Sequence, residues 1–135
     1  MTKYPQVKEL MIRNVVTVDC ETSVEEACKI MGDRHIGSLI VTKDRKPYGL
    51  FTERDLLSKV ISKGADLKKL KVKDFTSSPL ITIKPETSLF EASRIMSKMH
   101  IRRLPVFDTQ GRLVGIFTSA DVPTGVTKLL EFKET

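Results

Sequence analysis

The sequence of 135 residues contains no tryptophan, and its aromatic share is only 6%. It has two cysteines, Cys20 and Cys28, and two histidines, His35 and His100. Because these form neither a C-x-x-C pair nor a Cys/His cluster, a disulfide framework and a zinc site are not expected. No tract approaches the roughly 20 apolar residues that a membrane-spanning helix needs, and the first ten residues lack the apolar run of a signal peptide. We therefore expect a cytoplasmic protein without a metal.

The motifs of several enzyme classes are also missing. The chain has no G-x-S-x-G nucleophile elbow and no phosphate-binding G-x-x-x-x-G-K-[ST] loop, and neither histidine lies beside a repeated nucleophile. We therefore expect that the protein is not an enzyme and requires no cofactor for catalysis.

The net charge of +6 is concentrated in the second half of the chain. Residues 1–66 carry 11 Lys/Arg and 10 Asp/Glu, whereas residues 67–135 carry 12 and 7. A basic surface attracts nucleotide phosphates, nucleic acid or an acidic partner. A nucleic-acid-binding module is thus an alternative function, although the chain has neither a helix-turn-helix signature nor an aromatic RNA-binding motif.

The chain consists of two copies of one unit of about 60 residues. At an offset of 65, Glu21-Thr22-Ser23 matches Glu86-Thr87-Ser88, and His35-Ile36 matches His100-Ile101. After a one-residue insertion the offset becomes 66, and Thr52 and Asp55 match Thr118 and Asp121.

Each copy shows the pattern strand, helix, strand, strand, helix, which predicts an α/β fold. The predicted strands are 15–18, 38–41 and 48–51 in the first copy and 80–83, 104–107 and 113–117 in the second. S-x-x-E capping boxes begin the first helices at Ser23 and Ser88, and the last helices begin at Thr52 and Thr118. Two such copies packed sheet to sheet, with pseudo-twofold symmetry, would cover each other's apolar faces. Cys28 lies on an apolar helix stripe, and Cys20 is expected in a turn as a free thiol.

The segments Gly49–Leu56, Gly115–Val122 and His100–Val106, at this spacing, resemble a tandem pair of CBS (cystathionine-beta-synthase) motifs, often called a Bateman module. The resemblance assigns residues 7–64 to the first motif, 65–71 to a linker and 72–130 to the second. It implies a regulatory module that binds AMP, ADP, ATP or S-adenosylmethionine in two clefts between the motifs. It also implies a homodimer and a regulated partner protein that the sequence does not identify. Because no enzyme or channel is attached, we expect a module that stands alone.

The repeated T-x-x-D sequence suits the ribose of such a ligand. A carboxylate at the third helical position can accept charge-assisted hydrogen bonds from both hydroxyls of a cis-diol. Free backbone amides and the helix dipole at the same helix start favour an anion. The alternative is that each T-x-x-D is only a helix cap.

The resemblance implies that each cleft takes its T-x-x-D from one motif and its adenine walls from the other. The first cleft would contain Thr52, Arg54, Asp55, Thr76, Ile81, Ile101, Arg102 and Arg103. The second would contain Met11, Val16, Ile36, Gly37, Thr118 and Asp121. The alternative is that the apolar residues form ordinary core and that the arginines are exposed surface charge.

The second cleft departs from the pattern. Pro123 follows Asp121 closely and would interrupt a helix that begins at Thr118, so that helix either starts later, with Asp121 as its cap, or is distorted. The first copy has Gly37-Ser38 where the second has Arg102-Arg103. We therefore expect tighter binding in the Asp55 cleft. A further alternative is a structural dimerisation module with empty clefts.

Overall fold

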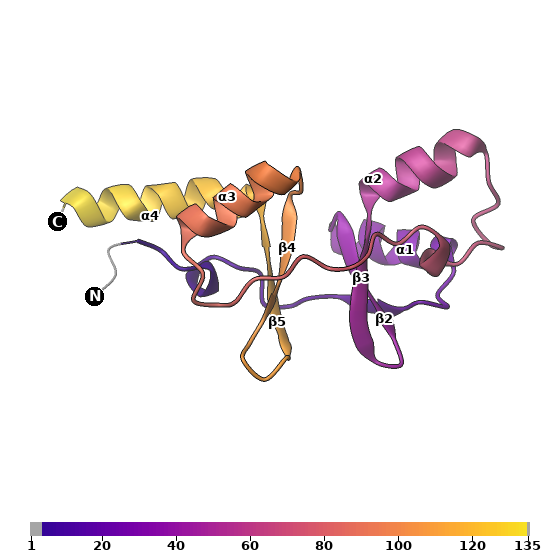
Figure 1. Ribbon diagram of the computed structural model, residues 1–135. Coiled ribbons are helices and arrows are strands. Elements are labelled where there is room, and N and C mark those ends of the chain that lie inside the picture. The colour runs from indigo at the N-terminus through magenta and orange to yellow at the C-terminus, as the bar shows by residue number, and fades with distance from the viewer. Residues whose placement is uncertain (1–3, 135) are drawn as a thin grey trace. The chain divides into compact units, whose positions relative to one another are not determined.

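The structure is a computed structural model that describes residues 4–134. It divides into two compact units (Figure 1). The middle unit is Val16–Leu80, and the terminal unit combines Met1–Val15 with Ile81–Thr135. Each unit therefore contains one copy of the repeat together with the segment that leads into the other copy.

The middle unit contains a three-stranded sheet in the order β1-β2-β3. Strand β1 (Thr17–Asp19) pairs in parallel with β2 (Ser38–Lys43), and β2 pairs antiparallel with β3 (Lys46–Thr52). Helix α1 (Val24–Arg34) connects β1 to β2. After β3, one helical segment runs through α2 (Glu53–Asp55), the π-helical turn η2 (Leu56–Val60) and the 3-10 turn η3 (Ile61–Lys63). The 3-10 turn η4 (Val72–Asp74) follows.

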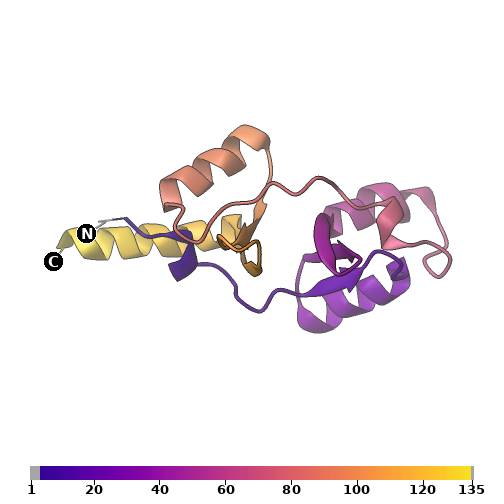
Figure 2. The same cartoon turned by 60° about the horizontal axis from the view of Figure 1, so that its bottom comes forward.

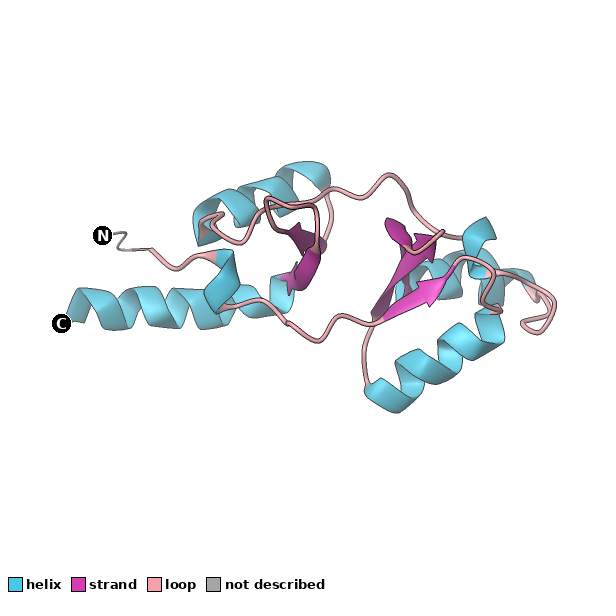
Figure 3. Ribbon diagram, turned by 90° about the horizontal axis from the view of Figure 1, so that it is seen from below, coloured by secondary structure: helices cyan, strands magenta, loops and turns pink. Residues whose placement is uncertain are grey.

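The terminal unit begins with the 3-10 turn η1 (Val7–Glu9) and continues with α3 (Leu89–Met99). Strands β4 (Arg103–Phe107) and β5 (Leu113–Thr118) form an antiparallel hairpin. The 3-10 turn η5 (Ser119–Asp121) then leads into α4 (Val122–Glu134). In both units the helices lie on one face of their own strands (Figures 2 and 3).

The serine half of each predicted capping box is present at the first helix of each copy. The Ser23 and Ser88 hydroxyls accept hydrogen bonds from the Glu26 and Glu91 amides, each at 3.1 Å. Both helices end at a histidine in the left-handed region, His35 with φ of 53° and His100 with φ of 55°. Gly64, a glycine in the left-handed region with φ of 65°, ends the helical segment after β3.

The prediction of a strand over 80–83 is wrong, because only Ile83 pairs with β4, as an isolated bridge to Val106. The reason lies in the partner strand. In the middle unit the Ile40 amide donates to the Val16 carbonyl at 3.1 Å. The matching residue of β4 is Pro105, which has no amide hydrogen, so Ile81 receives no such bond.

Each unit has its own apolar core, with Phe51 and Phe117 fully buried at matching positions. Cys20 lies in a turn and is a free cysteine, as expected, and it is buried, with 8% exposure, in the core of the middle unit. The linker expected over 65–71 also contributes to this unit. Leu67 and Leu70 pack against its core, and their carbonyls accept the Glu25 and Val24 amides at the start of α1.

Pro123 does not distort the last helix. The 3-10 turn η5 comes first, and Pro123 is the second residue of α4, where the first helical turn tolerates a missing amide hydrogen. Of the two alternatives, a later helix start is therefore the observed one. The cap, however, is Thr118 rather than Asp121, because Asp121 is the third residue after the cap and its carboxylate binds the Thr118 amide.

Candidate functional site

The first T-x-x-D sequence lies where β3 ends and α2 begins. Thr52 has extended backbone angles and is the helix cap. Its amide and its hydroxyl both donate to Asp55 Oδ2, at 2.9 and 3.0 Å, and the Asp55 amide donates to Thr52 Oγ1 at 3.2 Å. Asp55 is only 6% exposed. The carboxylate is therefore held in one orientation by the residue that ends the strand.

The second oxygen of Asp55 binds a lysine. Lys59 Nζ lies 2.9 Å from Asp55 Oδ1, and Lys59 belongs to the π-helical turn η2 one helical turn later. Thr52 and Lys59 together therefore provide a partner for each oxygen of this buried carboxylate.

The second T-x-x-D sequence repeats the first in the terminal unit. The Thr118 amide and hydroxyl donate to Asp121 Oδ2 at 2.8 and 3.2 Å. At the position that matches Lys59 the chain has Gly125, which packs closely beside Leu10 and Leu89. Among residues 4–131, whose side chains the structure describes, Asp121 forms no ion pair, and its Oδ1 has no hydrogen-bond donor.

A second segment borders the strand that leads to each helix start. In the middle unit, Leu50 and Ser77 exchange backbone hydrogen bonds of 3.0 and 2.9 Å. Thr76 covers Gly49 so closely that a Cβ there would overlap the Thr76 methyl group. In the terminal unit, Ile12 and Ile116 exchange two hydrogen bonds of 2.9 Å, and Met11 lies over Gly115 in the same way. A side chain in place of either glycine would therefore displace the neighbouring segment, through Thr76 at Gly49 and through the flexible side chain of Met11 at Gly115.

The amides at the helix starts are largely occupied. The Thr52 and Asp55 amides belong to the cap, and the Glu53 amide donates to the Gly37 carbonyl at 2.9 Å. In the terminal unit the Ser119 amide donates to the Arg102 carbonyl at 2.9 Å. These bonds occupy several of the amides that were expected to be free, and an anion contact at the helix starts stays a prediction.

The structure divides the predicted site residues between the units as follows. The middle unit contains Val16, Ile36, Gly37, Thr52, Arg54, Asp55 and Thr76, and the terminal unit contains Met11, Ile81, Ile101, Arg102, Arg103, Thr118 and Asp121. Each predicted cleft draws residues from both units, so both clefts remain predictions. Val16, Ile36, Ile81 and Ile101 pack partly buried against their own cores, and Arg54 and Arg102 are exposed.

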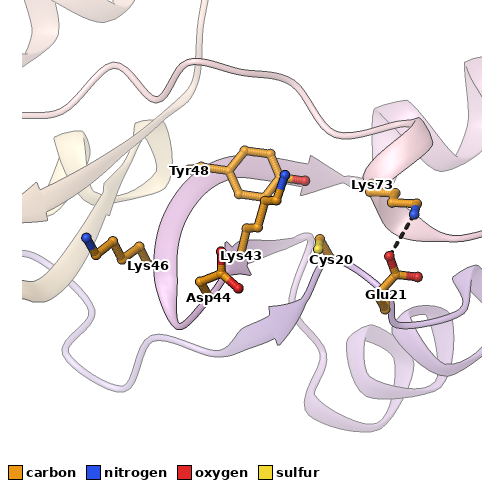
Figure 4. A pocket seen from close by; sticks show the side chains of 7 residues that line it. All are labelled: Cys20, Glu21, Lys43, Asp44, Lys46, Tyr48 and Lys73. Carbon is orange, nitrogen blue, oxygen red and sulfur yellow. Dashed lines mark hydrogen bonds and ion pairs between the residues drawn. The ribbon is translucent and has the colours of Figure 1, made fainter.

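The middle unit also has a surface pocket of about 560 Å³ that sequence reasoning missed (Figure 4). Its lining residues are Cys20, Glu21, Lys43, Asp44, Lys46, Tyr48 and Lys73. None of them belongs to the predicted clefts. In a sequence, lysines around a hairpin turn are indistinguishable from ordinary solvated charge, so no signal identified this pocket.

One ion pair crosses the wall of this pocket. Lys73 Nζ lies 2.6 Å from Glu21 Oε1, and this hydrogen bond raises the pKa of Lys73 (Figure 4). Burial raises the pKa of the Tyr48 hydroxyl, so Tyr48 is a neutral donor at physiological pH. With three lysines and two carboxylates, the pocket has an excess of one positive charge.

Side chains of the types that bind metals, and the thiol of Cys28, lie in the part of the chain that the structure describes. No group of three His, Cys, Asp or Glu there is placed to hold a metal ion. Burial, together with the nearby Glu25, raises the pKa of the Cys28 thiol, which keeps it protonated and unreactive. No helix among the described residues is long and apolar enough to cross a membrane.

Comparison with known sequences matches both copies of the repeat. The CBS domain profile matches residues 7–62 and 72–122. An uncharacterized protein of Methanopyrus kandleri, MK0525, is 39% identical over 118 residues, which are 86% of this chain and 60% of that protein. The CBS domain-containing protein YhcV of Bacillus subtilis is 33% identical over 116 residues, which are 86% of this chain and 81% of that one. The chain thus spans less than two thirds of the first relative and most of the second.

The fold matches as well. A hexameric CBS-CP12 protein from bloom-forming cyanobacteria superimposes with a TM-score of 0.84 at 30% identity, covering 98% of this chain and 75% of that one. Its likeness extends over both units, and the mixed α/β fold with two CBS motifs expected from the repeat is confirmed. With both copies matched in sequence and in fold, this chain belongs to the CBS domain family and contains a tandem pair of CBS motifs.

Proposed function

We propose that this protein is a regulatory module that senses an adenosine-containing ligand, AMP, ADP, ATP or S-adenosylmethionine. One observation carries the proposal. Two carboxylates, Asp55 and Asp121, occupy matching positions in the two units, and each is oriented by the amide and hydroxyl of the threonine three residues earlier. A carboxylate fixed in this way retains acceptor capacity for a neighbouring pair of ribose hydroxyls.

The surrounding residues fit the remaining parts of such a ligand. Thr76 directs its hydroxyl hydrogen to the Val72 carbonyl at 2.6 Å, which leaves its oxygen as an acceptor for an amino group. Arg54 and Arg102 are exposed cations that could bind phosphate oxygens, and the net charge of +6 favours an anionic ligand. Partly buried side chains such as Ile36 and Ile101 would supply apolar contacts for adenine.

We propose further that the protein assembles as a homodimer. The helical segment of the middle unit exposes Leu57 and Ile61, which are 62% and 49% exposed, and α4 exposes Val126 and Leu130, at 43% and 54%. In each case the two residues are four positions apart and lie on one helix face. The cyanobacterial CBS-CP12 protein, a relative in fold, is described as hexameric, which supports self-association. Light scattering should give the dimer mass.

Calorimetry with AMP, ADP, ATP and S-adenosylmethionine tests the ligand, with GMP as a matched control that keeps ribose and phosphate and changes only the base. We expect at least one adenosyl compound to bind at least tenfold more tightly than GMP. Equal affinity for AMP and GMP would contradict adenine recognition. Absence of binding by all five compounds would overturn the proposal and favour a structural module.

A further inference from the structure

The two T-x-x-D carboxylates differ in one contact. Asp55 has Thr52 on Oδ2 and Lys59 on Oδ1, at 2.9 Å. Asp121 has the same threonine contacts on Oδ2, but no described side chain or backbone group, over residues 4–131, donates to its Oδ1. The repeat therefore places one fully partnered carboxylate in the middle unit and one with an open oxygen in the terminal unit.

The difference is built into the sequence and the packing. The position that carries Lys59 in the first copy carries Gly125 in the second. A Cβ on Gly125 would lie 2.9 Å from methyl carbons of Leu10 and Leu89, so this helix position admits no longer side chain without repacking. Lys59 has room to extend, since its side chain is 45% exposed. The residue belongs to a π-helical turn, a feature that is frequent at functional sites.

We infer that Lys59 competes with the ligand for Asp55, so that the Asp121 site binds the ribose hydroxyls first and the Asp55 site fills only at higher ligand concentration. This inference rests on the proposed function, since it concerns the same carboxylates. An ammonium group at 2.9 Å withdraws acceptor strength from Oδ1 and occupies the position that a hydroxyl donor would take. Two sites of unequal affinity would extend the range of ligand concentration over which the module responds.

The order of filling reverses the one expected from the sequence alone. Pro123 and the lack of a basic pair near Gly37 suggested that the Asp121 site is the poorer one. The structure weakens the first reason, because the Thr118–Asp121 contacts are intact beside Pro123. The lysine at the Asp55 site supplies an independent reason for the opposite order.

The test uses Lys59→Met, which keeps the length of the side chain and removes the charge. The matched control is Lys63→Met, four residues further along the same helical segment, which makes the same change in net charge. Adenosine serves as the ligand because it is neutral, so loss of a lysine does not weaken a phosphate contact. The Thr52 and Thr118 amides, each bonded to its aspartate, report the two sites separately in a nuclear magnetic resonance titration.

In the wild type we expect the Thr118 amide to respond at lower adenosine concentration than the Thr52 amide. Lys59→Met should lower the midpoint at Thr52 by about two- to fivefold, the range of a partly exposed ion pair, and leave Thr118 unchanged. Lys63→Met should change neither. An unchanged or higher midpoint at Thr52 in Lys59→Met would overturn the inference while leaving ligand binding itself intact. If neither amide responds to adenosine, or to AMP, ADP, ATP or S-adenosylmethionine, in any of the three proteins, the proposed function fails and the inference fails with it.

Discussion

Replacement of Asp55 by alanine should destabilise the fold considerably more than replacement of Asp121. From the sequence, Asp55 would be an exposed cap whose loss costs about 1 kcal/mol. The structure shows instead a carboxylate that is 6% exposed and holds both the amide and the hydroxyl of Thr52. The variant leaves this amide without its acceptor in a partly buried place.

The magnitude follows from the contacts that are lost. A hydrogen bond to a charged acceptor contributes about 1.5–3 kcal/mol, and the second bond, from the Thr52 hydroxyl, adds less because the hydroxyl can turn to another acceptor. The Lys59 ion pair contributes only about 0–1 kcal/mol, because the lysine is 45% exposed and screened by solvent. We expect a loss of about 2–4 kcal/mol for Asp55→Ala and about 1–2 kcal/mol for the half-buried Asp121→Ala.

Urea denaturation gives both free energies, and amide hydrogen exchange assigns each loss to a unit. Asp55→Ala should accelerate exchange in β2 of the middle unit, and Asp121→Ala should accelerate it in β4 of the terminal unit. Equal losses, or a larger loss for Asp121→Ala, would show that burial and the lysine contact do not stabilise the fold at Asp55. The result also decides how ligand titrations of Asp55→Ala are read, because reduced binding then includes a contribution from unfolding.

Two further predictions concern glycine packing and pH. Gly49→Ala should lower the free energy of unfolding by about 1–3 kcal/mol, because the new Cβ would meet Thr76. Gly32→Ala, in α1 with open space around it, should raise the free energy of unfolding by about 0.5–1 kcal/mol. Thermal melting of both variants tests the pair, and a Gly49→Ala protein as stable as the wild type would contradict the close contact. Hydrogen bonds from the Arg112 amide and, secondarily, from its side chain hold the pKa of Asp108 below its ordinary value. The contribution of these bonds to the free energy of unfolding is therefore present above about pH 4 and is lost as the pH falls through the lowered pKa. The chemical shift of the Arg112 amide should therefore titrate below the ordinary aspartate range, and a midpoint within that range would refute the assignment.

The repeat made most of the fold predictable, and local chemistry explains where prediction failed. Ser23, Ser88 and Gly64 act as the caps that their residue types indicate, because cap bonds depend on only a few neighbouring residues. The absence of a strand before Ile83 could have been predicted from the sequence, because Pro105 lies at the β4 position whose amide hydrogen would have to bind that strand. The repeat alone gave the wrong prediction there, because Ile40, the residue of the first copy that matches Pro105, does have an amide hydrogen and donates it to Val16.

The site was less predictable than the fold. The T-x-x-D pattern identified both carboxylates and the threonines that bind them. It could not show that Asp55 is buried or that Lys59 reaches it, because that contact depends on the π-helical turn between them. The lysine-lined pocket beside Tyr48 combines residues from three separate stretches of chain, and no local pattern relates them.

The terminal unit combines residues 1–15 with residues 81–135, and this arrangement has a consequence for how the chain folds. During synthesis, the middle unit is complete once Leu80 has emerged, and all its partners lie within 65 consecutive residues. Ile12 must wait for Ile116, more than a hundred residues later, before its backbone pairs form. At about 5–20 residues per second this delay lasts roughly 5–20 s. The segment around Ile12 therefore stays without its partner while the middle unit is already complete, and in this interval the chain is most exposed to chaperones and to mispairing with other copies.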